Sequence, residues 1–230
     1  MSSIQLVVFD IAGTTVRDTG NVAKAFIDAF REFNHDIPAE QVSHVMGFRK
    51  KDAIRMLLAG ENNETLIEGI HDAFTRNILA LYENDPALAP LPQVEETFQL
   101  LKQWGIKIAL NTGFTRPVAN AILQRLQWST PETVDMVLCS DEVPAGRPHP
   151  DMIKTIMQQM DITDSKAVVK VGDTKVDVEE GRNAGCGLVV SVTTGANTRS
   201  ELALCKPDHI IDSIAELPAL FPVQYSAFNI

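Results

Sequence analysis

Apolar residues along the chain follow two spacings, which predict strands and helices in alternation. Runs made mostly of branched or aromatic residues, typical of strands in a buried parallel sheet, occur at 4–9, 106–110, 136–139, 168–171, 188–192 and 210–211. From residue 94 on, apolar residues before and between these runs recur at helical spacing over about 94–104, 118–126 and 153–160. Because such alternation requires a parallel sheet with right-handed crossovers, the pattern predicts an α/β fold.

The segment between the first two predicted strands shows helical spacing only. Its apolar residues are Val22, Ala23, Phe26, Ile27, Phe30, Phe33, Ile54, Leu57, Leu58, Ile67, Ile70, Phe74, Ile78 and Leu81. Prolines at positions 86, 90 and 92 then close the segment. We therefore predict a helical cap domain at 16–88, inserted into a Rossmann-like, doubly wound core domain of residues 1–15 and 89–230. The aromatic residues of the cap are predicted to form its core rather than a ligand site.

Composition narrows the function classes. A chain of 230 residues with 45% hydrophobic content suits one α/β core with a small insertion. The formal net charge of −10 argues against non-specific binding to nucleic acid or to an anionic membrane. Cys139, Cys186 and Cys205 are scattered and are expected to be reduced thiols. With no basic leader and no apolar run long enough to span a membrane, we expect a cytoplasmic protein.

Asp10 ends the first predicted strand and begins the stretch Asp-Ile-Ala-Gly-Thr-Thr-Val. The carboxyl ends of the strands are where α/β sheets place their chemistry. Gly13 permits a tight turn, and Thr14 and Thr15 offer hydroxyl and backbone N–H groups to an anion. Taken alone, Asp10 is equally compatible with the simple end of a strand.

A second acidic motif follows the predicted strand at 168–171. Asp173 comes after Gly172, and Asp177 follows four residues later. Two such carboxylates can meet Asp10 on a neighbouring strand, and three clustered anions repel one another unless a cation lies between them. Oxygen ligands of this kind suit Mg²⁺. A lone motif of this type is often a helix N-cap with a solvated acid, but the presence of Asp10 favours the metal site.

Two further segments add groups that can bind a phosphoryl oxygen. Thr112 and Gly113 follow the strand at 106–110, and they offer a hydroxyl and a backbone N–H. Arg147 lies between prolines in the stretch 144–150 and can act as an electrostatic clamp on Asp10 and on a transferring phosphoryl group. Considered alone, Arg147 is better explained as a surface residue in a proline-rich loop.

These four motifs, in this order, resemble the haloacid dehalogenase superfamily over nearly the whole chain. The resemblance implies a nucleophile at Asp10, phosphoryl-oxygen binding at Thr112 and a cationic stabiliser at Arg147. It also implies a Mg²⁺ site whose ligands are the carboxylates of Asp10, Asp173 and Asp177 and the main-chain carbonyl of Ala12.

Ala12 also narrows the reaction class. Phosphatases and mutases of this superfamily usually carry a second Asp at that position, which protonates the leaving oxygen. Ala12 has no ionisable group, and losing a general acid lowers a rate by a factor of about 10²–10⁴. The residue therefore argues against a simple phosphomonoesterase and favours a leaving group that needs no such acid.

The motifs resemble the phosphonoacetaldehyde hydrolase (phosphonatase) branch in particular. Shared stretches begin at Asp10, at Thr112 (Thr-Gly-Phe-Thr-Arg), at Val143 (Val-Pro-Ala-Gly-Arg-Pro) and at Lys170 (Lys-Val-Gly-Asp-Thr). The cap segment Met-Gly-Phe-Arg-Lys-Lys-Asp at 46–52 also fits, and it implies that Lys50 forms a Schiff base with an aldehyde substrate. The residues predicted to contact the substrate are Ala12, Gly13, Thr14, Met46, Gly47, Gly113 and Phe114.

An imine at Lys50 is chemically coherent with Ala12. The imine turns the carbon leaving group into an enamine, so that Asp10 can attack phosphorus and break the P–C bond without a neighbouring acid. The reaction needs a neutral amine, and Arg49 and Lys51 are predicted to lower the pKa of Lys50. Without the resemblance, residues 49–51 are better explained as a solvated, basic helix start.

Three positions depart from the phosphonatase pattern: Ala53, Gly20 and Phe114 stand where that family has His, Cys and Tyr. They leave the substrate open between a small carbonyl phosphonate and, as alternatives, a small phosphomonoester or a ligand bound without turnover. The expected partner is thus a small phosphonate or phosphate. The resemblance also implies a homodimer formed through the cap.

Overall fold

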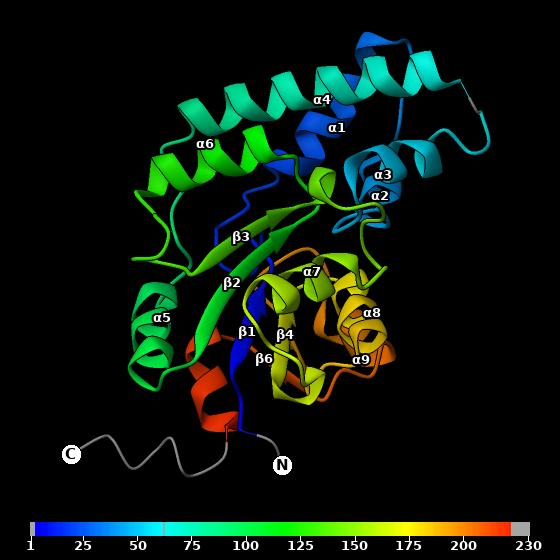
Figure 1. The fold of residues 1–230 in the computed structure, drawn as a ribbon. Coiled ribbons are helices and arrows are strands. Elements are labelled where there is room, and N and C mark those ends of the chain that lie inside the picture. Colours follow the sequence, from blue (N-terminus) through cyan, green and yellow to red (C-terminus); the bar gives the residue numbers. More distant parts are fainter. Residues whose placement is uncertain (1–2, 62, 222–230) are drawn as a thin grey trace.

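The central strand of the core is β1 (Leu6–Phe9), which lies between β2 and β4 of a parallel sheet (Figure 1). The computed structural model describes residues 3–61 and 63–221. Its sheet has the strand order β3-β2-β1-β4-β5-β6. The other strands are β2 (Lys107–Thr112), β3 (Met136–Cys139), β4 (Val168–Gly172), β5 (Leu188–Val192) and β6 (His209–Ile211). The predicted doubly wound parallel sheet is confirmed.

The register of the sheet brings the motif residues to one edge. Phe9 is aligned with Leu110 of β2 and with Val171 of β4. Asp10, the residue that follows β1, therefore lies beside the last residues of both neighbouring strands. Because parallel strands share one direction, their carboxyl ends meet at this edge, and the loops that follow them lie side by side.

Helices cover both faces of the sheet. They are α5 (Val94–Gln103), α6 (Arg116–Leu126), α7 (Asp151–Gln159), α8 (Lys175–Ala184) and α9 (Arg199–Leu204), with 3₁₀ turns at Ser140–Glu142, Ser165–Ala167 and Ile214–Leu220. Side chains of β1 alternate between the faces, so Val7 and Phe9 pack in the cluster that holds α5 and α6, whereas Leu6 and Val8 pack with α7 and α8. Both faces of the sheet are therefore covered by helices, which explains the continuous apolar runs of the strands.

Between β1 and α5 the described residues form four helices. They are α1 (Asn21–Glu32), α2 (Ala39–Ser43), α3 (Lys50–Leu57) and α4 (Glu64–Asn84), all within the predicted cap range of 16–88. Figure 1 shows these helices beyond the carboxyl ends of β2 and β3, with α4 lying along α6. Phe26 of α1 packs on Phe74 of α4, with ring centroids 4.5 Å apart.

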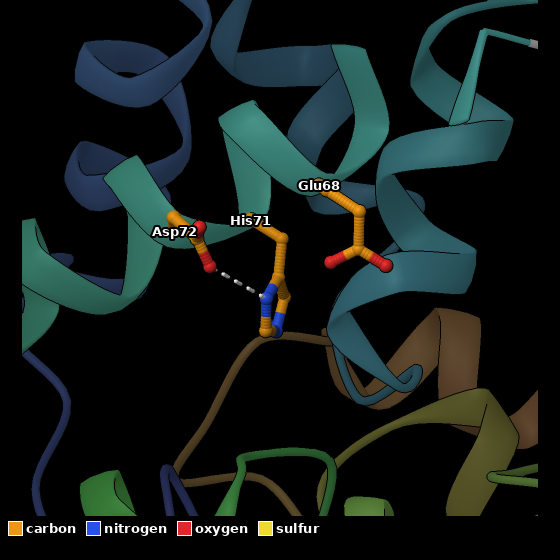
Figure 2. A group of neighbouring side chains, drawn as sticks. All are labelled: Glu68, His71 and Asp72. Atoms are coloured by element: carbon orange, nitrogen blue, oxygen red, sulfur yellow. Dashed lines mark ion pairs between the residues drawn. The ribbon is translucent and has the colours of Figure 1, made fainter. Parts of the chain in front are cut away.

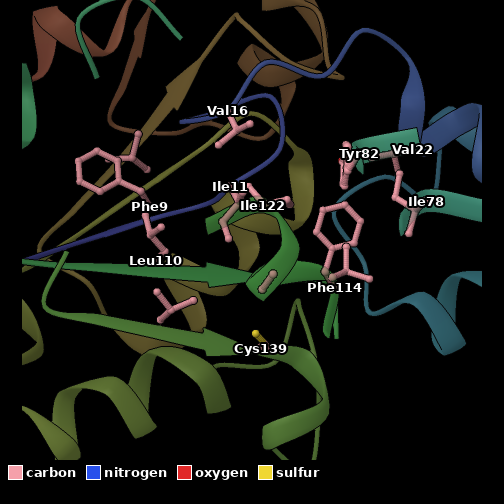
Figure 3. Close-up of a cluster of buried hydrophobic side chains, with 14 of the residues drawn as sticks. Phe9, Ile11, Val16, Val22, Ile78, Tyr82, Leu110, Phe114, Ile122 and Cys139 are labelled. Atoms are coloured by element: carbon pink, nitrogen blue, oxygen red, sulfur yellow. The ribbon is translucent and has the colours of Figure 1, made fainter. Parts of the chain in front are cut away.

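The cap and the core share one hydrophobic cluster. Figure 3 shows Phe114, from the loop after β2, beside Ile78 and Tyr82 of α4. The rings of Tyr82 and Phe114 meet edge to face, with centroids 6.1 Å apart. Any motion of the cap against the core therefore has to break apolar contacts around Phe114. Among the described residues, no helix combines the length and the apolar character that a membrane crossing requires.

Candidate active site

A cavity of about 240 Å³ lies between the carboxyl ends of the strands and the cap. Its core wall includes Asp10, Ala12, Gly13, Thr112, Gly113, Phe114, Arg147 and Asp173. Its cap wall includes Asp18, Gly20, Met46, Gly47 and Lys50. The structure thus brings together every predicted site residue except Thr14 and Asp177, which are buried behind the cavity wall.

Asp10 is held by Arg147. The guanidinium donates from Nη1 to Oδ1 of Asp10 over 2.6 Å, across 137 positions of sequence. Arg147 is only 2% exposed, so its interpretation as a surface residue is wrong. Burial raises the pKa of Asp10, and although Arg147 lowers it, the net shift is upward. A nucleophilic carboxylate at this place therefore depends on nearby positive charge.

Arg147 is itself oriented by a buried polar network. Its Nη2 donates to the main-chain oxygen and to Oδ1 of Asn111, at 2.6 and 2.7 Å. Its Nε lies 3.1 Å from Oε2 of Glu180, which also lies 3.2 Å from Nζ of Lys170. Burial lowers the pKa of Arg147, but the carboxylates of Asp177, Asp10 and Glu180 raise it by more than burial lowers it. The net shift is upward, so the guanidinium stays charged.

Sequence reasoning did not assign roles to Asn111 and Lys170. One signal was available, since Lys170 interrupts an apolar strand, where a charged residue needs a buried partner. Glu180 and Arg182 lie on different sides of α8, as an i,i+2 pair should. Glu180 points into the network, whereas Arg182 pairs with Asp208 at the surface.

Asp173 and Asp177 have different surroundings. Asp173 lines the cavity, and it accepts hydrogen bonds from the hydroxyl of Thr14 (2.8 Å) and the N–H of Ala196 (2.7 Å). Burial and the charges of Asp10 and Asp177 raise the pKa of Asp173 to about 8. Thr14, which the sequence predicted to contact substrate, therefore lies behind Asp173 and holds it.

Asp177 is engaged with cations of the core. Its Oδ1 lies 3.1 Å from Nη1 of Arg147 and 3.0 Å from Nζ of Lys170. Its Oδ2 accepts the backbone N–H of Thr174 in a capping box that starts α8. Burial raises the pKa of Asp177, but Arg147 and Lys170 more than offset this and hold it below its usual range. The ligand role of Asp177 stays a prediction, since both of its oxygens already have protein partners.

The donor set on the core side fits a divalent cation. Four buried carboxylates face two buried cations there: Asp10, Asp173, Asp177 and Glu180 against Arg147 and Lys170. Besides burial, the charges of Asp10 and Asp177 raise the pKa of Asp173, as is expected where carboxylates outnumber cations. Oxygen donors from Asp10, Asp173 and the carbonyl of Ala12 are the type that Mg²⁺ prefers.

A second group of side chains of the kind that bind metals lies on α4, but its charge is already partly neutralised. Glu68, His71 and Asp72 approach one another there (Figure 2). The carboxylate of Glu68 is 2.6 Å from Nζ of Lys51, so a cation already neutralises it. The cluster is best explained as part of the charged surface of the cap.

Lys50 is the first residue of α3 and is buried, with only 5% of its surface exposed. Its Nζ lies 4.8 Å from the ring centroid of Phe114, 5.7 Å from that of Phe26 and 6.0 Å from that of Phe74. It also donates to the main-chain oxygen of Phe48 over 3.3 Å. The interpretation of residues 49–51 as a solvated helix start is therefore wrong for Lys50.

The pKa of Lys50 is lowered to about 8, first by burial and then by the charge of Arg147. The sequence predicted that Arg49 and Lys51 lower this pKa, and that prediction is wrong. Arg49 donates to the main-chain oxygen of Pro144, and Lys51 pairs with Glu68, so both point away. The aromatic residues of the cap likewise do more than fill its core, since Phe26 and Phe74 surround the amine.

Two glycines allow the cap loop to touch the core beside Lys50. A Cβ on Gly113 would lie 2.5 Å from the main-chain oxygen of Phe48. A Cβ on Gly47, where φ is +83°, would lie 2.4 Å from Oγ1 of Thr174. Because no side chain fits at either place, the two glycines are needed for the cap loop to lie against the core.

Thr112 and Asp18 complete the wall. The hydroxyl oxygen of Thr112 accepts the N–H of Phe114 over 3.2 Å, which fixes the hydroxyl at the end of β2. Asp18, a cavity residue that sequence reasoning missed, caps α1 through hydrogen bonds from the N–H groups of Gly20 and Asn21. Its signal was an Asp followed by Thr-Gly-Asn just before a helical pattern.

Residues 7–191 match the model of the haloacid dehalogenase-like hydrolases. This chain belongs to that family. The chain is also 31% identical to the phosphonoacetaldehyde hydrolase of Bordetella pertussis, over 94% of this chain and 90% of that protein. It is 33% identical to that of Bacillus cereus, over 89% of this chain and 80% of that protein. The family predicted from the motifs, and its relation to phosphonoacetaldehyde hydrolases, are confirmed.

Solved structures of the haloacid dehalogenase-like family show the same fold. A phosphonoacetaldehyde hydrolase-like protein from Oleispira antarctica superposes with a TM-score of 0.83 at 23% identity, over 95% of this chain and 91% of that chain. At this identity the likeness supports the arrangement of sheet and cap. The chemistry of this hydrolase depends on the residues of its own site.

Proposed function

We propose that this haloacid dehalogenase-like hydrolase cleaves the P–C bond of a small carbonyl phosphonate of the phosphonoacetaldehyde type, with Mg²⁺ as cofactor. The observation that carries the proposal is Lys50, a buried amine whose pKa is lowered to about 8 and which lines the same cavity as Asp10. A cavity of about 240 Å³ suits a small substrate. The two relatives named phosphonoacetaldehyde hydrolase support the substrate class.

The environment of Lys50 favours an imine. With a pKa of about 8, roughly a tenth of the amine is neutral at pH 7, against about one part in several thousand for an exposed lysine. Phe26, Phe74 and Phe114 surround Nζ with aromatic rings. Burial and the charge of Arg147 disfavour the ammonium form of Lys50 by more than the carboxylates of Asp10, Asp18 and Asp173 favour it. Attack on the aldehyde carbon gives a carbinolamine, which loses water to form the iminium.

Asp10 then acts as the nucleophile toward phosphorus. Its carboxylate attacks, the P–C bond breaks, and the electron pair moves through the carbon chain to the iminium nitrogen, which leaves a neutral enamine. This leaving group needs no acid beside Asp10, which accounts for Ala12. We expect Arg147 and Thr112, which line the cavity with Asp10, to hold phosphoryl oxygens. Mg²⁺, held by Asp10, Asp173 and the carbonyl of Ala12, would neutralise the phosphoryl charge when bound.

The intermediates are resolved by water. Water attacks the phosphorus of the aspartyl-phosphate and restores Asp10 with release of phosphate. The enamine takes up a proton on carbon, and water then hydrolyses the resulting iminium to the aldehyde and free Lys50. The overall reaction converts phosphonoacetaldehyde and water to acetaldehyde and phosphate.

Cyanoborohydride trapping tests the proposal directly. Hydride addition to the iminium converts it to a stable secondary amine on Lys50. We expect incubation with phosphonoacetaldehyde and cyanoborohydride to modify one lysine, which peptide mass spectrometry should locate at position 50. Lys51, which pairs with Glu68 on the surface, serves as the internal control. Absence of an adduct, together with phosphate release from phosphomonoesters, would contradict the proposal and indicate a phosphatase.

The pKa of Lys50 predicts the pH dependence of trapping. The pKa is lowered to about 8, so the neutral amine is the minor form below this pH and the major form above it. With aldehyde below saturation, the initial rate of modification should rise about tenfold per pH unit up to pH 7 and level off above about pH 9. Initial rates at intervals between pH 6 and 10 would measure this. A midpoint near 10.5 would mean that the amine is solvated.

A further inference from the structure

One ionisable residue of the cavity has no task in the proposed reaction. Among the described residues, the ionisable side chains that line the cavity are Asp10, Asp18, Lys50, Arg147 and Asp173. The reaction assigns the nucleophile, the imine, the phosphoryl clamp and the metal site to four of them. Asp18 is left over, although it lies on the cap wall with Lys50.

The geometry of Asp18 combines a fixed oxygen with an available one. Its Oδ1 accepts the N–H groups of Gly20 (3.1 Å), Asn21 (2.9 Å) and Val22 (3.5 Å) at the start of α1. These contacts hold the carboxyl group in place. Within the described part of the chain, Oδ2 takes part in none of the hydrogen bonds or ion pairs of Asp18. Asp18 therefore keeps one oxygen for a proton or for a ligand.

The charges around Asp18 relate it to Lys50. Burial raises the pKa of Asp18, while the three N–H groups and then the charge of Lys50 lower it, with a net upward shift. Asp18 in turn favours the ammonium form of Lys50. Asp18 also acts on the phenol of Tyr82, which is buried and whose pKa is raised well above its usual value, so it stays neutral.

Three other positions of the site offer no acid or base. Ala53, one turn further along α3, is fully buried in the apolar cluster. Ala12 on the core wall has no ionisable group, and Phe114 has no hydroxyl. Imine formation moves protons between nitrogen and oxygen. The carboxylates of Asp10 and Asp18 both act on Lys50, and since Asp10 serves as the nucleophile, Asp18 is the carboxylate of the cap wall that is left to carry these protons.

We propose that Asp18 is the proton carrier for imine formation at Lys50, a role that rests on the proposed function. Asp18 accepts a proton from the Lys50 ammonium, and the neutral amine attacks the carbonyl carbon. Asp18 then gives its proton to the alkoxide oxygen, takes one from the nitrogen, and returns it to the hydroxyl, which departs as water while the nitrogen lone pair forms C=N. Summed, ammonium and aldehyde give iminium and water, and Asp18 ends as a carboxylate.

The test is Asp18→Asn, which keeps an oxygen that caps α1 but cannot carry a proton. Since Asn and Asp cap helices about equally well, we expect the melting temperature to stay close to that of the wild type. The initial rate at which acetaldehyde and cyanoborohydride modify Lys50 should fall about 10²-fold or more. Asp28→Asn, which removes one charge from the outer side of α1, is the matched control and should trap at the wild-type rate.

Chemical rescue separates proton transfer from positioning. Added formate, a small carboxylic acid, should raise the trapping rate of the Asp18→Asn variant in proportion to its concentration and leave the wild type unchanged. Asp18→Glu, which restores a carboxyl group, should trap faster than Asp18→Asn. If Asp18→Asn traps at the wild-type rate, or if formate has no effect on a slow variant, Asp18 is only a helix cap and the proposal is overturned. Wild-type enzyme that traps neither acetaldehyde nor phosphonoacetaldehyde would overturn the proposed function as well.

Discussion

Replacing Lys50 by Arg should abolish phosphate release from phosphonoacetaldehyde in the presence of Mg²⁺, with a fall on the order of 10⁴-fold or more. Arginine keeps the positive charge that faces Phe114, Phe26 and Phe74, but a guanidinium does not form an imine. Without the imine, the carbon leaving group is an unstabilised carbanion, and Ala12 supplies no acid to protonate it. A continuous phosphate assay on wild type and variant would measure the loss.

Lys51→Arg is the matched control for Lys50→Arg. Lys51 follows on the same helix, but it points away and pairs with Glu68, 2.6 Å from Nζ. The same chemical change there should leave phosphate release within about twofold of wild type. Lys50→Arg enzyme that still releases phosphate from phosphonoacetaldehyde would show that Lys50 does not form the catalytic imine, and phosphate release from phosphomonoesters by both proteins would establish the phosphatase alternative.

Replacing Asp10 by Asn should also remove phosphate release, on the order of 10⁴-fold or more, but it should spare the trapping of an aldehyde on Lys50. The amide cannot act as the nucleophile. Losing the charge of Asp10 removes the largest electrostatic effect that favours the ammonium form of Lys50, so the neutral amine needed for trapping is not depleted. Asn can still accept the hydrogen bond that Arg147 donates to Asp10, so the buried network keeps its shape. Phosphate release and cyanoborohydride trapping, measured on the same preparation, would separate the two half-reactions.

Asp212→Asn provides the control for Asp10→Asn, because Asp212 carries the same charge at the surface, where it pairs with Arg199. It should affect neither measurement. An Asp10→Asn variant that also fails to trap would mean that Asp10 is needed before the P–C bond breaks, for instance to set the charge at Lys50. A variant that retains phosphate release would exclude an aspartyl-phosphate at this position.

Much of the candidate site was readable from the sequence, because its residues follow strands. Asp10 directly follows β1, and Asp173 directly follows β4. Thr112 is the last residue of β2. In a parallel sheet the ends of adjacent strands are neighbours in space, so three local patterns predicted one long-range cluster. Phe9 is indeed level with both Leu110 and Val171. Lys50 was different, since only its resemblance to a family motif singled it out.

The sequence did not reveal the environments of charged side chains. Thr14 was predicted to contact substrate, and instead its hydroxyl holds Asp173, 159 positions away. Arg49 and Lys51 were predicted to tune Lys50, yet both pair with distant groups. Asp18 was missed because a helix-capping carboxylate looks the same in a sequence whether it faces solvent or a cavity. In each case the deciding partner lies on another element of the fold.

By itself, the sequence determined the strand and helix pattern, the family and the residues at the carboxyl edge of the sheet, because all of these depend on local spacing. Only the tertiary structure decided which side chains are buried together. It placed Lys50 among Phe26, Phe74 and Phe114, and it set Arg147 between Asp10 and Glu180. The pKa of a group depends on desolvation and on the charges within a few ångströms of it, and these are supplied by segments that are far apart along the chain.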